Sequence, residues 1–512
     1  MKKILSLIII AAITFTSCKK DLNQVPISTT TTATFYKQPS DFVQGTNAIY
    51  NQLRGYPDRL NSLSEIRSDN IYGVTVAGRE WDPINNFATG IAPNVYVEEA
   101  WSSDFNGIFR ANTVLDQIVQ NGSFVGSAVL ATRLSAEAKF LRAFFYFDLV
   151  KYYGKVPVVE HPVSAAEAIS IPRSPVTDVY ALIIADLQFA ITNLPANYSG
   201  AYPAYGAADI GRATKYAAEA LLAKVYMTRS GPTYGIEGPG LGLSEWTLAL
   251  PLLQDIITNG GFVFNPSYAN IFSYANQSPA ITSGNREAVF DVMYMSGQSP
   301  VLGATYVWGL TPQNYLTTVG ATLNSAGSLE IIPVTPNLIN AYDPADVRKG
   351  VTVFTAGYTF AGNTENRPFF KKWLDITKVP LTRFDWAENF IAIRYTDILM
   401  LKAECILHGA PGSQADVDGI VTQVRTRAGL GALSNVTLPQ LFAERRLEFA
   451  NEGQRWFDLQ RSGDLVTIMN AWKATDDAQN KVNNVVANYV IYPVPQTQMD
   501  AVPGLYIQNL GY

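Results

Sequence analysis

The feature that most constrains the fold is a helical segment at residues 135–153 with almost no polar face. At 3.6 residues per turn, its large and small apolar side chains surround nearly the whole helix: Ala136, Phe140, Leu141, Ala143, Phe144, Phe145 and Phe147. A helix that is apolar on all sides must be enclosed by other elements. The sequence therefore predicts a helical bundle with this segment at its centre.

Helical periodicity extends over much of the chain. We expect helices near residues 41–54, 101–120, 130–153, 177–193, 212–230, 245–259, 395–408, 415–427 and 437–462. The segment at 214–229 is rich in alanine on faces where two helices would approach closely, which is typical of helical hairpin repeats. A clean 34-residue period is absent, so the tetratricopeptide-like arrangement is predicted from the faces of the helices and not from a repeat.

Between residues 261 and 394 the helical periodicity gives way to short β-prone runs and loops. Short β-prone runs, Phe262–Phe264 and Ala288–Val292, occur among loops rich in Gly, Asn, Thr and Pro. The predicted fold is mainly α, with tetratricopeptide-like helical hairpins and a loop-rich, mixed α/β insertion. We divide it into an N-terminal helical region (41–260), a ligand-binding insertion (261–394) and a C-terminal helical region (395–512).

The first 18 residues have the pattern of a secretory leader. Lys2 and Lys3 precede an apolar run at 4–15, and Cys18 follows small residues at the point where cleavage is expected. The position of Cys18 resembles the lipobox of bacterial lipoproteins, which predicts a signal over 1–18 and lipidation of Cys18. An ordinary secretory signal with an incidental cysteine is the alternative. Residues 19–40, rich in Thr, Ser and Pro, are predicted to be a tether.

Composition excludes several classes of function. The formal net charge is −5, so nucleic acid is not expected as a partner. The chain has two histidines, His161 and His408, which makes a zinc site or a histidine-based catalytic triad improbable. The signatures of metalloproteases, serine hydrolases and phosphate-binding loops are missing from the sequence. We therefore predict no metal and no cofactor.

The densest charge pattern lies between Glu444 and Arg461. On one continuous helix, Glu444, Glu448 and Glu452 would stack at four-residue spacing and repel one another unless arginines neutralised them. Two carboxylates could catalyse glycoside hydrolysis, which gives a remote enzymatic alternative. Because charges of both signs alternate here, a buried ion-pair network that fixes the helix to its neighbours is the favoured interpretation.

The same segment, E-R-R-x-E-F-x-x-E-G-x-R-W-F-D-L-x-R, closely resembles the C-terminal signature of the SusD/RagB family of outer-membrane lipoproteins of Bacteroidetes. Further stretches agree with that family in the right order, at residues 138–149, 153–157, 213–226, 394–399, 492–496 and 508–512. Leu510 replaces the proline that is usual in the family's ending. The resemblance covers nearly the whole chain after Cys18.

This resemblance implies a protein that binds and does not catalyse. Family members are lipid-anchored at the outer membrane, face the cell exterior and cap a SusC-like TonB-dependent transporter. Their ligands are mostly oligosaccharides, with peptides in some branches. We therefore predict a glycan-binding lipoprotein that captures oligosaccharides and delivers them to the transporter, with peptide binding as the alternative.

Two loop segments have the composition of a glycan platform, in which flat aromatic faces stand beside polar side chains. They resemble in location the loops that carry ligand aromatics in the family's starch-binding member. The predicted site residues are Tyr72, Arg79, Trp81 and Asn85 in the first segment (69–96), and Tyr294, Tyr306, Trp308 and Tyr315 in the second (294–315). Three other tryptophans are predicted to pack in the core, namely Trp101, Trp373 and Trp456.

Overall fold

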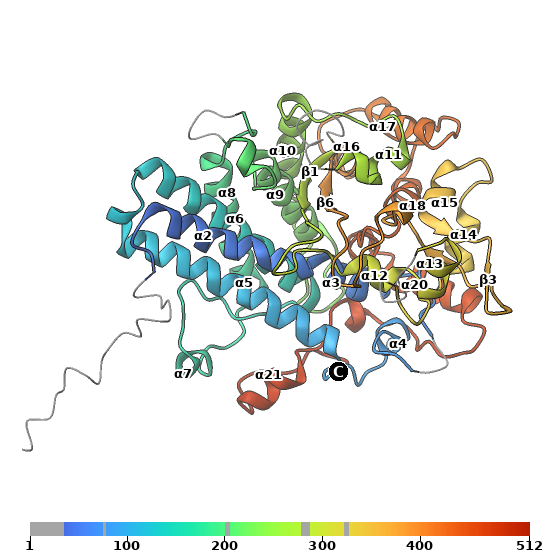
Figure 1. Cartoon of the computed structure of the whole chain (residues 1–512), viewed down its shortest axis with the longest axis horizontal. Coiled ribbons are helices and arrows are strands. Elements are labelled where there is room, and N and C mark those ends of the chain that lie inside the picture. The colour runs from blue at the N-terminus through green and yellow to red at the C-terminus, as the bar shows by residue number, and fades with distance from the viewer. Residues whose placement is uncertain (1–34, 75–77, 200–204, 278–286, 322–326) are drawn as a thin grey trace, which may run out of the picture.

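The computed structural model divides into a body of long helices and a region of short elements beside it. It describes residues 35–74, 78–199, 205–277, 287–321 and 327–512. The predicted signal, Cys18 and most of the tether lie outside the described residues. In Figure 1 the long helices α2, α5, α6 and α8 lie on one side, and the short helices and strands that include α12–α15 and β3 lie on the other.

The long helices pack in succession, each against the next along the chain. α5 contacts α6, α6 contacts α8, α8 contacts α9, and the series continues through α10 and α16 to α17, while α2 covers α5 and α6. Their bounds are α2 Pro39–Tyr50, α5 Val95–Gln120, α6 Ala128–Tyr153, α8 Val176–Asn193, α9 Lys215–Ser230, α10 Trp246–Asn259, α16 Tyr395–Leu407 and α17 Gln414–Arg427. The predicted mainly α architecture of helical hairpins is confirmed.

Helix α6 is the predicted central helix. Almost every side chain between Ala136 and Tyr153 is buried, which explains the missing polar face. The Ser127 hydroxyl accepts from the Leu130 amide at the start of the helix. α5 approaches α6 so closely that a Cβ at Gly107 would lie 2.4 Å from the ring of Phe145. Glycine at this position lets the two longest helices pack directly against each other.

The insertion combines short helices with three two-stranded antiparallel sheets among the described residues. The sheets pair β1 (Ala288–Val292) with β6 (Phe390–Arg394), β2 (Val353–Phe354) with β5 (Phe369–Phe370), and β3 (Tyr358–Phe360) with β4 (Asn363–Glu365). Its helices are α11 Tyr268–Phe272, α12 Tyr306–Leu310, α13 Gln313–Thr318, α14 Pro336–Ala341 and α15 Val347–Thr352.

One predicted strand run is wrong. Phe262–Phe264 is irregular, whereas Ala288–Val292 forms β1 as expected. The run at 262 has no strand partner among the described residues. Instead the ring of Phe262 packs against Tyr216, and the guanidinium of Arg427 lies 3.9 Å from the ring centre of Phe264. Side-chain packing, and not a backbone ladder, holds this segment in place.

The predicted single helix at 437–462 is also wrong, because it divides into α18 (Leu438–Phe449) and α19 (Arg455–Ser462). Asn451 and Gly453 adopt positive φ angles of 65° and 68° at the break. A Cβ at Gly453 would lie 2.6 Å from the Cβ of Leu60, so glycine allows this turn to approach the N-terminal region. The chain ends with α20 (Leu465–Asp476) and α21 (Gln496–Ala501).

A single apolar cluster joins the helical body to the insertion, with buried members from Ile49 to Val494. The predicted core tryptophans Trp101, Trp373 and Trp456 are all buried in it. Two further short helices, α3 (Tyr56–Leu60) and α4 (Asp82–Asn85), connect the body to the site described below, whereas α7 (Ala165–Ala168) lies between α6 and α8 in the chain and does not line that site. No helix of the described chain is long and apolar enough to cross a membrane.

Candidate ligand-binding cavity

A cavity of about 1330 Å³ opens where α3, the start of α5 and the residues before α4 meet the insertion. Figure 1 shows α3 beside α12 at this junction. The helical part contributes Asp58, Arg59, Arg79, Glu80, Trp81, Tyr96 and Glu99, among others. The insertion contributes residues that include Tyr306, Trp308, Gln313, Glu330, Arg383 and Phe384. A cavity of this size can hold an extended small ligand.

Four of the eight predicted site residues line this cavity. Arg79 and Trp81 come from the first predicted segment, and Tyr306 and Trp308 come from the second. The two segments are about 200 residues apart in the sequence, and the fold places residues of both around one cavity. The cavity therefore combines two indoles with the guanidinium of Arg79, a pair of chemistries that suits a ligand with flat apolar faces and polar edges.

The two indoles are positioned by different local structures. Trp81 stands at the N-cap of α4, immediately before Asp82 and a proline, and is partly exposed. Trp308 lies within α12, where its Nε1 donates to the carbonyl oxygen of Gly327 at 2.9 Å. The guanidinium of Arg383 lies 4.8 Å from the Trp308 ring centre. Trp308 is thus held at its polar edge and covered in part by a cation.

Tyr72 and Asn85 lie near the cavity segment but have other contacts. The Tyr72 hydroxyl donates to Asp477 at 2.8 Å, and its ring packs against Trp472. Asn85 is fully buried. Its amide donates to the carbonyls of Ile66 and Ile71, and its oxygen accepts from the Gly73 backbone. These bonds shape the loop that presents Trp81.

Tyr294 and Tyr315 belong to the second segment but not to the cavity lining. The Tyr294 side chain is largely buried, and its hydroxyl donates to the Arg54 carbonyl at 2.7 Å, which ties the insertion to the helical body. Tyr315 packs in an aromatic cluster with Phe354, Tyr358 and Phe369, at ring-centre distances of 4.8, 5.6 and 5.1 Å. Both are explained by packing.

Several lining residues carry charge and were not predicted from the sequence. Asp58, Glu99 and Glu330 lie outside the two loop segments that were selected for their aromatic composition. Arg383 and Phe384 do pair a cation with an aromatic ring in a short loop. The criterion that identified Trp81 and Trp308 would have found this pair if it had been applied beyond residue 315.

The charges on the lining differ in how far they are neutralised. Arg59 is buried and binds Asp104 at 2.7 Å and Asp148 at 3.4 Å, behind the cavity surface. Asp58 accepts from the Thr305 hydroxyl at 2.6 Å, and burial raises the pKa of this carboxyl to about 6. Burial also raises the pKa of Glu99, which Arg59 opposes. The cavity thus offers carboxylates that can accept hydrogen bonds from hydroxyl groups.

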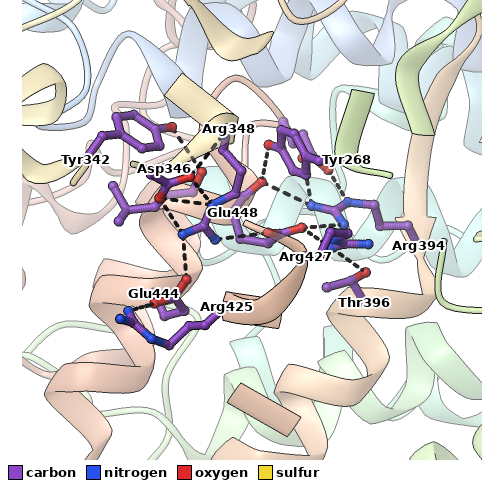
Figure 2. Close-up of polar contacts among 12 residues, drawn as sticks. Tyr268, Tyr342, Asp346, Arg348, Arg394, Thr396, Arg425, Arg427, Glu444 and Glu448 are labelled. Atoms are coloured by element: carbon purple, nitrogen blue, oxygen red, sulfur yellow. Dashed lines mark hydrogen bonds and ion pairs between the residues drawn. The ribbon is translucent and has the colours of Figure 1, made fainter. Parts of the chain in front are cut away.

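The second cluster of carboxylates, in the segment from Glu444 to Arg461, is closed to a ligand. Glu448 is fully buried and contacts three arginines, Arg348 at 3.1 Å, Arg394 at 2.9 Å and Arg427 at 2.5 Å (Figure 2). These guanidinium groups outweigh burial and hold the pKa of Glu448 well below its usual range. The favoured interpretation as an arginine-clamped network matches these contacts.

The neighbouring acids are paired in the same way. Glu444 contacts Arg348 at 2.6 Å and Arg425 at 3.0 Å, which Figure 2 also shows. Glu452 does not stack on Glu448, because it lies in the turn after α18 and contacts Lys372 and Arg394. None of these carboxylates lines the cavity. The described residues also contain no cluster of three or more His, Cys, Asp or Glu side chains that could hold a metal ion.

Two family models match different parts of the chain. One, described as the SusD family, matches residues 345–512, and another, described as starch-binding associating with outer membrane, matches residues 24–227. Among curated proteins, SusD-like protein P2 of Formosa agariphila is 26% identical and aligns over 100% of both chains. A SusD-like protein of Bacteroides ovatus is 26% identical over 90% of this chain and 82% of its own.

Solved structures share the fold. A laminarin binding SusD-like protein superposes with a TM-score of 0.72 at 24% identity, covering 93% of this chain and 100% of its own. Surface glycan-binding protein A from Bacteroides thetaiotaomicron, solved in complex with laminarihexaose, gives a TM-score of 0.75 at 21% identity, with the same coverage. The two family models together match residues 24–227 and 345–512, the relatives align along nearly the whole chain, and the chain belongs to the SusD family.

Proposed function

We propose that the chain binds an oligosaccharide in the cavity described above and does not modify it. The observation that carries this proposal is the placement of Trp81 and Trp308, from distant segments, on the lining of one large cavity. Indole faces can stack on the apolar C–H faces of sugar rings. Asp58, Glu80 and Glu99 can accept hydrogen bonds from sugar hydroxyls, and Arg79 can donate them.

The family and the names of its relatives support a carbohydrate ligand. Two of the similar structures are described as binding laminarin and as a complex with laminarihexaose. One matching family model is described as starch-binding. These glucans share repeating neutral rings with two unlike faces, which is the chemistry that an indole-lined cavity can recognise.

The role in uptake follows from the family resemblance. The protein would be anchored in the outer membrane through lipidated Cys18, face the cell exterior and deliver its ligand to a SusC-like TonB-dependent transporter. Pull-down of the lipidated protein from detergent-solubilised outer membrane should recover a large β-barrel transporter. Recovery of the lipoprotein without any such partner would contradict the delivery role.

Binding is tested by calorimetric titration of the chain that begins after Cys18 against a panel of polysaccharides. We expect one glycan to bind, and Trp81→Ala and Trp308→Ala each to weaken that binding. The panel should be recovered unchanged after incubation with the protein. A folded protein that binds no glycan but binds members of a peptide library would replace the carbohydrate proposal with the peptide alternative.

A further inference from the structure

The cavity lining carries carboxylates that form no ion pair among the described residues. Glu80 and Glu99 are both exposed, and neither forms an ion pair within the part of the chain that the structure describes. The partner of Asp58 is a neutral hydroxyl, that of Thr305. All three acids come from the helical side of the cavity, on α3, on the loop before α4 and on the second turn of α5.

All three carboxylates raise the pKa of one neighbouring side chain, the phenol of Tyr96. Tyr96 lines the cavity, and the pKa of its phenol is raised to about 12 by burial and then by Glu80, Glu99 and Asp58, in that order. A carboxylate raises the pKa of a phenol when it lies close enough for the two charges to interact, so all three acids lie on the part of the lining near Tyr96. The side of the cavity at Tyr96 is therefore an acidic wall, made of Asp58, Glu80 and Glu99.

Most of the cations on the lining are already engaged. Arg59 is buried against Asp104 and Asp148. The Arg79 guanidinium lies 3.0 Å from Glu330, another lining residue. Arg383 forms no ion pair among the described residues and stacks over the rings of Trp308 and Phe384. Among the described residues, the lining thus holds one arginine without an ion pair, Arg383, and three acids without one, Asp58, Glu80 and Glu99.

We infer that this cavity selects uncharged glycans over glycans that carry carboxylate or sulfate groups, an inference that rests on the proposed function. An anionic sugar near Tyr96 would be repelled by the acidic wall, whereas a neutral sugar would donate its hydroxyl hydrogens to the same oxygens. Discrimination against a wrong ligand often comes from such a repulsive element. Because Glu80 and Glu99 are exposed, the repulsion weakens as salt rises.

The test compares one sugar in three forms on the full chain. Each neutral oligosaccharide of the panel is titrated beside the same compound oxidised at C6 to the uronic acid, and beside the methyl ester of that acid. The ester restores neutrality while it keeps the added atoms. At low ionic strength we expect the neutral form and the ester to bind roughly tenfold more tightly than the acid, and the gap to narrow at high salt.

Variants locate the effect. The double variant Glu80→Gln with Glu99→Gln should bind the oxidised sugar more tightly. The difference in affinity between the neutral and the oxidised sugar should then fall to about threefold or less. Glu98→Gln is the control, because it removes one negative charge from α5, as Glu99→Gln does, beside the cavity residue. The Glu98 carboxylate bonds to Thr497 and does not line the cavity. This control should leave the gap unchanged.

The outcomes separate the two proposals. If the oxidised sugar binds as tightly as its neutral parent, or more tightly, the selection is refuted while the glycan-binding function stands. A gap that remains in the double glutamine variant, or that closes in Glu98→Gln, also refutes the role of the acidic wall. If no form of any sugar binds to the folded protein, the proposed function fails, and this inference fails with it.

Discussion

The carboxylates of two acidic regions of the molecule differ in burial and in ion pairing. In the C-terminal helices, Glu444 and Glu448 are buried, and each contacts at least two arginines (Figure 2). At the cavity, Glu80 and Glu99 are exposed and have no ion-pair partner among the described residues. The first arrangement uses charge to fix helices to strands and loops. The second leaves charge available to a ligand.

This contrast explains why the sequence motif that identifies the family gives no information about the ligand. The segment from Glu444 to Arg461 is dense in charge because α18 and α19 must each be joined to several other elements. Its residues identify the family and hold the fold. The residues that can touch a ligand come from loops, from short helices and from the start of α5, outside that motif.

The largest effect is expected from breaking the network at its centre. Glu448→Ala should lower the free energy of unfolding by about 3–5 kcal/mol, because three buried arginines lose their shared partner. Urea denaturation followed by circular dichroism measures the change. Glu80→Ala at the cavity is the matched control and should change stability by less than about 0.5 kcal/mol. Similar losses in both variants would remove the distinction between the two regions.

Glu388 combines features of the two regions, because it is buried but forms no ion pair with an arginine among the described residues. Neither of its carboxylate oxygens has a hydrogen bond within the described chain, and burial raises its pKa to about 8. Between the ordinary glutamate pKa and 8, the folded state binds more protons than the unfolded state. Stability contributed by Glu388 therefore falls as pH rises through this window.

Glu388→Gln should remove that fall. Between pH 5 and pH 9, we expect the wild type to lose on the order of 2 kcal/mol relative to the variant, with nearly equal stabilities at pH 5. Urea titrations at several pH values measure the difference. A constant difference between the two proteins across this range would mean that Glu388 does not titrate there.

The division between framework and ligand site also limits what the sequence could predict. Apolar periodicity located the long helices, because a helix such as α6 has to be buried on every side. It could not foresee the break between α18 and α19, which depends on the contact of Gly453 with Leu60, nearly 400 residues earlier. Contacts of that range leave no local pattern.

At the site, aromatic composition found the segments but could not separate lining residues from packing residues. Trp81 and Tyr72 stand nine residues apart in one loop-rich segment, yet Tyr72 bonds to Asp477 and Trp81 lines the cavity. Asp58 and Glu99 were missed because they lie on helices, whereas the search for a ligand platform was confined to loop segments. Which side chain faces a cavity depends on tertiary packing that one sequence does not display.

A smaller effect is expected at Trp308, on binding. Trp308→Ala should weaken glycan affinity roughly tenfold, because a sugar ring loses its stacking surface. Trp308→Phe should lie between the wild type and the alanine variant, since it keeps a flat ring but loses the bond from Nε1 to Gly327. Calorimetric titration with the glycan that binds the wild type measures both. An unchanged affinity in Trp308→Ala would remove Trp308 from the binding surface.

The smallest effect on binding is expected at Tyr315, which lies in the same segment but outside the cavity. Tyr315→Ala should change affinity by less than about twofold, although it should cost roughly 1 kcal/mol of stability through the lost contacts with Phe354 and Phe369. The same titration, with denaturation as a check on folding, measures both quantities. A tenfold loss of affinity here would extend the binding surface over the aromatic cluster, and the boundary between packing and ligand contact in the insertion would have to be redrawn.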